Sequence, residues 1–219
     1  MDLVLDGAER LVGAAAAFLP ALETALAGLP PDRAGIRLHG NEALAALLAP
    51  DVLGTAAATR LGPGAKPVRA ILFDKSERAN WALGWHQDRT VAVAARADVP
   101  GFGPWSVKAG IIHVEPPFTL IERMLTIRVH LDAVDTDNAP LLVAPGSHRL
   151  GRIAERDIDA AVTRCGTIAC LAERGDLWIY ATSILHASAA SAKVGHRRVL
   201  QVDYSADSLP APLAWRGLV

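Results

Sequence analysis

The alternation of apolar and polar positions divides the chain into two regions of different texture. Before residue 67, apolar residues recur at helical spacing from Val4 to Leu19 and again from Asn41 to Leu48, and a proline follows each segment. We therefore expect residues 1–66 to be helical. From Pro67 onward the apolar runs are short and are separated by Gly, Pro, Asp and Asn, a pattern typical of strands.

The second region contains many short strands. The runs read VRAILF, TVAVAA, VKAGIIHV, MLTIRVHL, LLVA, DLWIY and RRVLQVDY. Such a succession predicts a sandwich, barrel or jelly roll and not a doubly wound parallel sheet. No glycine-rich phosphate loop, internal repeat or long low-complexity linker interrupts it. We therefore expect one domain over residues 1–219, in which residues 1–66 pack on a β core formed by residues 67–219.

Charge and composition narrow the class of partner. The 219 residues carry a formal net charge of -1 with scattered Lys and Arg, so the sequence indicates neither a nucleic-acid surface nor a polybasic membrane patch. Two cysteines, Cys165 and Cys170, are too few for a thiolate zinc site and are typical of a reducing compartment. Acidic residues near the apolar N-terminus argue against a signal peptide. We expect a cytoplasmic protein that acts on a small molecule.

Two histidines and one carboxylate have the pattern of a metal site. In LGWHQDRTVAV, His86 and Asp88 are one residue apart beside a β run, so strand alternation directs both side chains to one face. His186 follows a strong strand in DLWIYATSILHASAAS. Two histidines and a carboxylate on one face of the metal are the arrangement that non-haem Fe(II) oxygenases use. A closed structural site with four ligands would leave no room for substrate and dioxygen.

A cation shortly after the third ligand extends this pattern. In VGHRRVLQVDY, Arg197 begins a strand, and a guanidinium there can hold the far carboxylate of 2-oxoglutarate through two hydrogen bonds. The residues leave two alternatives open. One is a cupin-type metal-dependent enzyme that uses no oxo-acid co-substrate and has no need of Arg197. The other is a non-catalytic binding module that keeps the barrel.

Four segments occur in a characteristic order. They are WHQD, LDAVDTDNAPLLVAPGSHRLGRI, GDLWIYATSILHASAAS and HRRVLQVDY. In order and rough spacing they resemble the phytanoyl-CoA dioxygenase family of Fe(II)- and 2-oxoglutarate-dependent oxygenases, which includes ectoine hydroxylase. The resemblance extends from about Pro67 to the C-terminus. It implies a mainly β fold with N-terminal helices, in which a double-stranded β-helix forms a cupin-like jelly roll.

The resemblance also implies a reaction. Iron would bind to His86, Asp88 and His186, and the enzyme would hydroxylate a small organic substrate while it converts 2-oxoglutarate and dioxygen to succinate and carbon dioxide. Related halogenases have a small residue in place of the carboxylate so that chloride can bind the iron. The retained Asp88 therefore implies hydroxylation.

The co-substrate contacts implied by the resemblance involve several residues. Arg197 would bind the 2-oxoglutarate carboxylate with help from Ser188, and Arg198 is the alternative if the strand register shifts by one. Asn80 resembles an asparagine that family members place shortly before the first metal ligand to contact 2-oxoglutarate, and Lys75 is a further candidate. The sequence does not identify the substrate or the oligomeric state.

Some residues have a structural or uncertain interpretation. The family commonly has a glycine in place of Ala139, so a turn there is expected to differ. His148 follows a Pro-Gly turn and is interpreted as structural. His113 is expected in the core or in a pocket wall. Among the tryptophans, we expect Trp85 and Trp105 to line the substrate cavity because they flank the metal strand and the loop after it.

Overall fold

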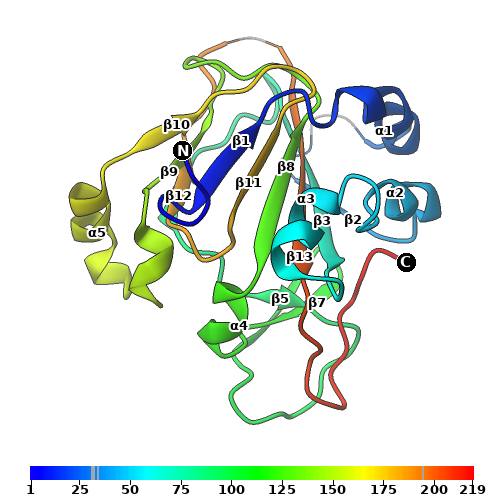
Figure 1. Ribbon diagram of the computed structural model, residues 1–219, viewed down its shortest axis with the longest axis vertical. Helices are drawn as coiled ribbons and strands as arrows, with labels where there is room; N and C mark the ends of the chain where they lie inside the picture. The colour runs from blue at the N-terminus through cyan, green and yellow to red at the C-terminus, as the bar shows by residue number, and fades with distance from the viewer. Residues whose placement is uncertain (31–32, 34, 194) are drawn as a thin grey trace.

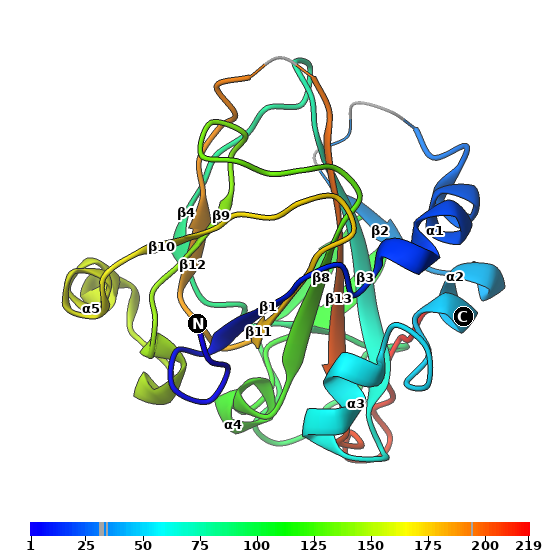
Figure 2. The same ribbon diagram turned by 45° about the horizontal axis from the view of Figure 1, so that its top comes forward.

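Two antiparallel β-sheets face each other at the centre of the computed structural model, which describes residues 1–30, 33, 35–193 and 195–219 (Figures 1 and 2). The larger sheet contains, in spatial order, β1 (Ala8–Leu11), β11 (Leu177–Ala181), β8 (Leu125–His130), β13 (Arg197–Ser205), β3 (Lys66–Lys75) and β2 (Ile36–Leu38). The smaller sheet contains β10 (Ile168–Cys170), β9 (Leu141–Val143), β12 (His186–Ser188) and β4 (Leu83–His86). This architecture confirms the jelly roll expected from the sequence.

A third, small sheet and short helices surround these two sheets. The small sheet contains β5 (Val91–Ala92), β7 (Ile111–Val114) and β6 (Trp105–Lys108). The α-helices are α1 (Leu19–Leu26), α2 (Glu42–Leu47), α3 (Thr55–Leu61), α4 (Phe118–Glu122) and α5 (Ile158–Cys165). The 3-10 helices are η1 (Ala16–Phe18), η2 (Ser147–Leu150) and η3 (Glu155–Asp157). Helices α1, α2 and α3 lie outside the larger sheet, and α5 lies beside the smaller one (Figure 2).

Side chains along β3 alternate between the main hydrophobic core and a cavity on the opposite face of the sheet. Ala70 and Leu72 belong to the main hydrophobic core, which the outer face of the larger sheet shares with the helices. Arg69, Ile71 and Phe73 point the other way and line a cavity. Because successive side chains of a strand point to opposite faces, the apolar positions hold the helices while the intervening positions carry the chemistry. The paired strand β13 has the same alternation.

The N-terminal region contributes strands as well as helices. Residues Ala8–Leu11 form β1, which pairs with β11, and Ile36–Leu38 form β2, which pairs with β3. The helix expected from Val4 to Leu19 is therefore wrong over most of its length. Pairing with an exposed sheet edge satisfies the backbone groups of this segment, and that tertiary gain outweighs its helical spacing. Residues 1–66 thus extend the larger sheet at both edges in addition to covering it.

The second predicted helix is confirmed, and its start has a clear cause. Helix α2 begins after Asn41, whose side chain accepts a hydrogen bond from the backbone N–H of Leu44 at 2.9 Å, a usual N-terminal cap. In contrast to its expected role as a terminator, Pro20 lies in the first turn of α1, where a missing N–H costs no helical hydrogen bond.

Among the described residues, no helix is long and apolar enough to cross a membrane.

Candidate active site

The three residues predicted to bind metal lie together on the inner side of the smaller sheet. His86 ends β4 and His186 begins β12, and the two residues are direct partners across these antiparallel strands. Their ring centroids are 4.3 Å apart. Asp88 follows β4, and one ligand atom from each of the three residues lies within 4.8 Å of the others. Residues far apart in the sequence therefore form one compact donor set.

Gln87 lies between His86 and Asp88 in the sequence, and its side chain anchors this segment. Its side chain is buried and donates to the carbonyl oxygens of Gly151 at 3.0 Å and Ser183 at 2.8 Å. The side-chain oxygen Oε1 of Gln87 accepts a hydrogen bond from the backbone N–H of Ile153 at 2.9 Å. Because neighbouring side chains of an extended segment point in opposite directions, anchoring Gln87 on one side directs His86 and Asp88 to the other.

Both imidazoles are oriented for metal binding. The Nδ1 atom of His86 lies 2.8 Å from the carbonyl oxygen of Gly84, and that of His186 lies 3.0 Å from the carbonyl oxygen of Ile184. A carbonyl oxygen only accepts, so Nδ1 carries the proton and the Nε2 lone pair is available to a metal. Burial and the neighbouring His86 lower the pKa of His186 to about 4. This imidazole is therefore neutral at pH 7.

The carboxylate of the set is held ionised by a buried arginine. Arg69 Nη2 lies 3.1 Å from Asp88 Oδ2, and Arg69 Nε donates to Asp203. Asp203 also accepts from the hydroxyl of Thr126 at 3.0 Å. Burial raises the pKa of Asp88, but Arg69 and the two imidazoles together lower it to about 2. The donor set thus has two imidazoles and one negative charge at neutral pH.

The donor set opens onto a cavity of about 380 Å³ lined by residues of both large sheets. This volume is at the lower end of the range for small-molecule sites. Its lining contains the donor set, Ser188 and a series of cations, namely Arg37, Arg69, Lys75, Arg89, Lys108, Arg128 and Arg197. Within the described part of the chain, Asp88 is the one acidic residue in the lining. The cavity therefore favours anionic ligands.

One end of this cavity concentrates positive charge. Lys75 and Arg197 are cross-strand partners on β3 and β13, and each is only 2% exposed. Lys75 Nζ donates to Ser188 Oγ at 3.0 Å and to the carbonyl oxygen of Ala189, while Arg197 Nη1 donates to the carbonyl oxygen of Ala139 at 2.7 Å. These partners are all neutral. We refer to Lys75, Arg197 and the nearby Arg128 as the basic end.

No carboxylate in the described part of the chain forms an ion pair with the basic end. Burial, together with Arg197 and Arg128, lowers the pKa of Lys75 to about 7. Burial and Arg128 likewise lower the pKa of Arg197 to about 9. Buried cations without a counter-charge are costly. A ligand that brings negative charge would remove this cost, so the geometry is that of an anion site.

Residues 37–199 match the family described as phytanoyl-CoA dioxygenase (PhyH). The chain belongs to this family. The resemblance noted in the four sequence segments is therefore confirmed. No curated protein sequence matches the chain.

Solved structures share the fold of this phytanoyl-CoA dioxygenase family member. The apo form of EctD from S. alaskensis matches with a TM-score of 0.66 and 18% identity, covering 98% of this chain and 84% of that chain. The epimerase SnoN from nogalamycin biosynthesis matches with a TM-score of 0.64 and 14% identity over 99% and 83%. HygX from Streptomyces hygroscopicus matches with a TM-score of 0.62 and 13% identity over 93% and 83%.

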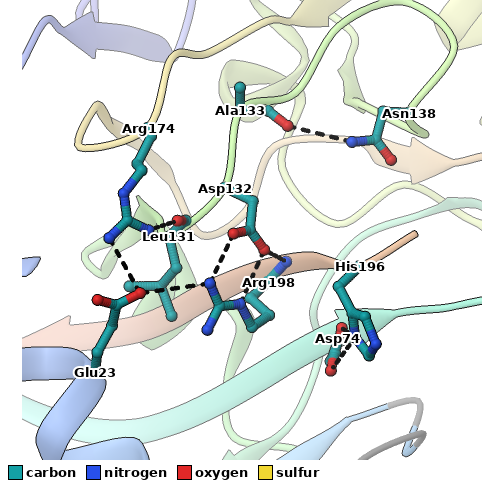
Figure 3. A network of polar contacts seen from close by, with 9 residues as sticks. All are labelled: Glu23, Asp74, Leu131, Asp132, Ala133, Asn138, Arg174, His196 and Arg198. Carbon is teal, nitrogen blue, oxygen red and sulfur yellow. Dashed lines mark hydrogen bonds and ion pairs between the residues drawn. The ribbon is translucent and has the colours of Figure 1, made fainter.

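Arg197 and its neighbour Arg198 have opposite environments in this family member. Arg197 faces the cavity, whereas Arg198 lies on the other face of β13 and binds both carboxylate oxygens of Asp132, at 2.9 and 2.7 Å (Figure 3). Glu23 joins the same network, 3.4 Å from Arg198 and 3.0 Å from Arg174. The register thus directs Arg197, and not Arg198, towards the cavity.

Ser188 and Asn80, the other predicted co-substrate contacts, differ in position. Ser188 lines the cavity and contacts Lys75. Asn80 is exposed and joins two loops, since its amide donates to the carbonyl oxygen of Ser191 at 2.8 Å and accepts from the N–H of Ser191 at 2.7 Å. It is not among the residues that line the cavity. The expected contact of Asn80 with 2-oxoglutarate stays a prediction, and Lys75 has the more direct position.

The aromatic lining differs from the expectation. Trp81 lines the cavity, with Lys75 Nζ 5.1 Å from its ring centroid. Trp85 packs against the cluster around α5, and Trp105 packs against the cluster between β5, β7 and α4. The prediction for Trp85 and Trp105 is wrong because nearness in sequence to the metal strand does not fix the side on which a side chain points.

His113, His148 and Ala139 have structural surroundings. His113 is fully buried and outside the cavity lining, with its Nδ1 2.9 Å from the carbonyl oxygen of Ile111. His148 lies in η2 and packs against Gly7. Ala139 has a φ of 50°, in the left-handed region that favours glycine. This conformation fits the glycine that the resemblance to the family implies at this position.

The sequence interpretation missed five cavity cations, Arg37, Arg69, Arg89, Lys108 and Arg128. Arg69 and Arg128 each interrupt an apolar strand run, in PVRAILF and LTIRVHL. A charged residue at an inward position of a buried strand is rare without a functional or paired role. The alternation within these runs could therefore have identified Arg69 and Arg128 as candidates. The sequence did not show which face of the sheet lines the cavity.

Proposed function

We propose that this chain is a dioxygenase that uses Fe(II) and 2-oxoglutarate to hydroxylate a small organic substrate. In this proposal His86, Asp88 and His186 hold the iron, and the basic end holds the far carboxylate of 2-oxoglutarate. The observation that carries the proposal is the combination of an open three-residue donor set with a buried anion site that lacks its own counter-charge.

The donor set fits Fe(II) in chemistry and in number. Two imidazoles and one carboxylate leave further coordination positions open, as oxygen activation and co-substrate binding require. The Nδ1 hydrogen bonds fix both ring orientations, and the Arg69 contact fixes the carboxylate. When bound, iron supplies the redox chemistry with dioxygen that amino-acid side chains cannot provide.

The basic end fits a dicarboxylate that reaches the metal. Ser188 lies two residues beyond His186 on the same strand, β12, a separation of roughly 7 Å along an extended chain. A five-carbon diacid can span this interval, with one end at the donor set and the other at Lys75 and Arg197. The guanidinium and ammonium groups then orient the co-substrate and neutralise its far carboxylate.

Several relatives of the fold support this assignment of ligands. EctD from S. alaskensis has been solved with bound Fe and, separately, with 2-oxoglutarate and 5-hydroxyectoine. HygX from Streptomyces hygroscopicus has been solved with nickel and 2-oxoglutarate. We extend the use of iron and 2-oxoglutarate to this chain on the basis of family membership and its own donor set.

The partners and location expected from the sequence belong to the same proposal. A small-molecule substrate and dioxygen are the proposed partners, without nucleic acid or membrane. Both cysteines, Cys165 and Cys170, are free thiols, which supports the proposed cytoplasmic location because reducing compartments keep thiols unpaired.

Anaerobic titration with Fe(II) and 2-oxoglutarate tests the proposal directly. The wild-type chain should develop the metal-to-ligand charge-transfer absorption of a chelated 2-oxo acid, and His186→Ala should not. Arg197→Met should weaken 2-oxoglutarate binding by about 10- to 100-fold, since a hydrogen bond to a charged group contributes roughly 1.5–3 kcal/mol. Arg198→Met is the matched control, because that guanidinium binds Asp132 on the opposite face.

Two results would contradict the proposal. A wild-type protein that binds Fe(II) but shows no charge-transfer band would exclude 2-oxoglutarate as a metal-chelating co-substrate and favour a cupin-type enzyme. Equal effects of Arg197→Met and Arg198→Met would show that the basic end has no special role. Under air, succinate formation that depends on Fe(II) should accompany the band and should be lost with it.

A further inference from the structure

A second pair of cations lines the cavity away from the basic end. Arg37 lies on the edge strand β2, directly opposite Ile71 of β3, and Ile71 is itself a cavity residue. Lys108 is the last residue of β6. Neither residue was predicted to have a role from the sequence. We refer to Arg37 and Lys108 as the second basic pair.

The second basic pair lies on the Asp88 side of the donor set. Asp88 and Arg69 both influence the pKa of Arg37 and that of Lys108, which places all four groups near one another. Arg69 and Lys75 are at opposite ends of the inner face of β3, six residues apart, or roughly 20 Å along the strand. The second basic pair and the basic end therefore flank the donor set and do not form one site.

The protein balances the charges near the second basic pair only in part, because the nearby Asp88 favours the charged forms of both members but forms its ion pair with Arg69. Arg69 is occupied by Asp88 and Asp203. Lys108 Nζ donates to the hydroxyl of Thr90 at 3.0 Å, and Arg37 Nε is buried without a hydrogen-bond partner in the described part of the chain. Burial and the nearby Arg69 lower the pKa of both members of the pair. Two cations held close to a third, one of them hydrogen-bonded only to a neutral hydroxyl among the described residues, are suited to an anion.

The position of Lys108 is fixed by the backbone. Strands β6 and β7 are joined by a two-residue turn in which Ala109 and Gly110 have φ values of 51° and 79°. Two successive positive φ angles are characteristic of the tight turn that matches the twist of a hairpin. Lys108 immediately precedes this turn and pairs with Ile111. A cation on a short, well-defined hairpin is suited to a preformed binding site.

We propose that Arg37 and Lys108 bind a carboxylate or phosphate group of the substrate that is oxidised, so that the substrate is a small organic acid. This inference rests on the proposed function, because it assumes that 2-oxoglutarate occupies the basic end. The two carboxylates of 2-oxoglutarate are then accommodated by the metal and the basic end, and neither member of the second basic pair forms an ion pair within the described part of the chain. The cavity of about 380 Å³ also limits the size of the acid.

Small probe anions test this inference on the full chain loaded anaerobically with Fe(II) and saturating 2-oxoglutarate. Propionate and methyl phosphate are titrated in separate experiments, with propionamide as the neutral match for propionate. Binding is measured by calorimetry and by the change in the charge-transfer band. We expect at least one anion to bind and propionamide not to bind. The anion that binds more tightly identifies the charged group of the substrate.

Variants connect this binding to the second basic pair. Arg37→Met and Lys108→Met should each weaken anion binding at least tenfold while 2-oxoglutarate affinity stays within twofold of wild type. Arg37→Lys should recover part of the loss because it restores the charge. Arg156→Met is the control, since the Arg156 side chain is 86% exposed and outside the cavity. Circular dichroism and the unchanged 2-oxoglutarate titration show that the variants are folded.

The outcomes separate this inference from the proposed function. If the wild-type charge-transfer band does not form, the proposed function is wrong. If the band forms but neither anion binds, the inference is overturned. It is also overturned if Arg37→Met binds both anions as tightly as the wild-type chain does. A loss of 2-oxoglutarate affinity in Arg37→Met would also overturn it, because that residue would then belong to the co-substrate site. Under air, a screen of acids against their amides should show that only acids stimulate succinate formation.

Discussion

The two ends of β3 hold buried cations in opposite ways. At one end, Arg69 is 9% exposed and lies between the carboxylates of Asp88 and Asp203. At the other end, Lys75 and Arg197 are each 2% exposed, and their hydrogen bonds among the described residues go to neutral oxygens. Both ends face the same cavity. The difference is whether the protein or a ligand supplies the negative charge.

This difference separates structural charges from binding charges. A buried ion pair is stable as a unit, but removing one partner leaves an uncompensated charge at a large cost. A buried cation that already lacks a counter-charge raises the energy of the free protein, and its removal leaves no charge unpaired. Arg69 should therefore matter most for stability and for the position of Asp88, whereas Lys75 and Arg197 should matter most for affinity.

The largest expected effect is on the free energy of unfolding of Arg69→Met. This variant leaves Asp203 buried without its cation, so we expect a loss of about 3–5 kcal/mol. Arg197→Met, at the other end, should change stability by less than about 1 kcal/mol. Urea unfolding of both variants, followed by circular dichroism with a chelator present, measures the contrast without a contribution from bound metal.

A double variant checks the cause of this effect. Arg69→Met combined with Asp203→Leu removes both charges, and it should recover much of the stability lost in Arg69→Met alone. Equal destabilisation by Arg69→Met and Arg197→Met would contradict the distinction between the two ends.

An intermediate effect is expected in the pH dependence of 2-oxoglutarate binding. The pKa of Lys75 is about 7 in the free protein, and a bound carboxylate raises it because it stabilises the ammonium. The dissociation constant for 2-oxoglutarate should therefore increase as the pH rises above 7, by up to about tenfold per pH unit. Calorimetric titrations between pH 6 and pH 9 measure this dependence. Lys75→Met should bind more weakly and flatten it, whereas Lys66→Gln should not.

Lys75 should also make the stability of the protein depend on pH. The sign is opposite to that of 2-oxoglutarate affinity, because affinity falls as the pH rises whereas the stability contribution increases. The folded pKa of Lys75 lies below its unfolded value of 10.5, so between about pH 7 and 10.5 the unfolded chain binds more protons. The contribution of Lys75 to stability should therefore increase with pH across this window. A wild-type stability contribution that decreases there relative to Lys75→Met would contradict the burial of an uncompensated ammonium.

The smallest expected effect concerns the carbonyl that orients Arg197. Ala139 has a left-handed φ, which costs roughly 1–2 kcal/mol for a residue with a Cβ, while glycine loses about 0.5–1 kcal/mol more backbone entropy on folding. Ala139→Gly should therefore stabilise the chain by about 0.5–1 kcal/mol in urea unfolding. Affinity for 2-oxoglutarate should stay the same, because only the backbone carbonyl of Ala139 contacts Arg197. A large loss of affinity would show that the turn itself shapes the basic end.

The sequence by itself determined the class of fold and the donor set. Short apolar runs with turn residues between them predicted a sandwich, barrel or jelly roll, and the resemblance to the family implied the jelly roll. The spacing of His86 and Asp88 predicted a shared face. These features are local, because strand alternation and turn chemistry depend on residues close in sequence. The sequence favoured Arg197 but left Arg198 open as the alternative. The structure directs Arg197 towards the cavity and pairs Arg198 with Asp132 on the opposite face (Figure 3).

The tertiary structure decided the pairings that no local pattern contains. It placed Ala8–Leu11 on a sheet edge, brought Lys75 opposite Arg197, and directed Trp81 instead of Trp85 into the cavity. It also grouped Arg37 with Lys108, which come from different sheets. The physical reason is that charge compensation depends on distances in space between segments far apart in the chain. A sequence shows which residues are charged, but only the fold shows which of those charges have partners.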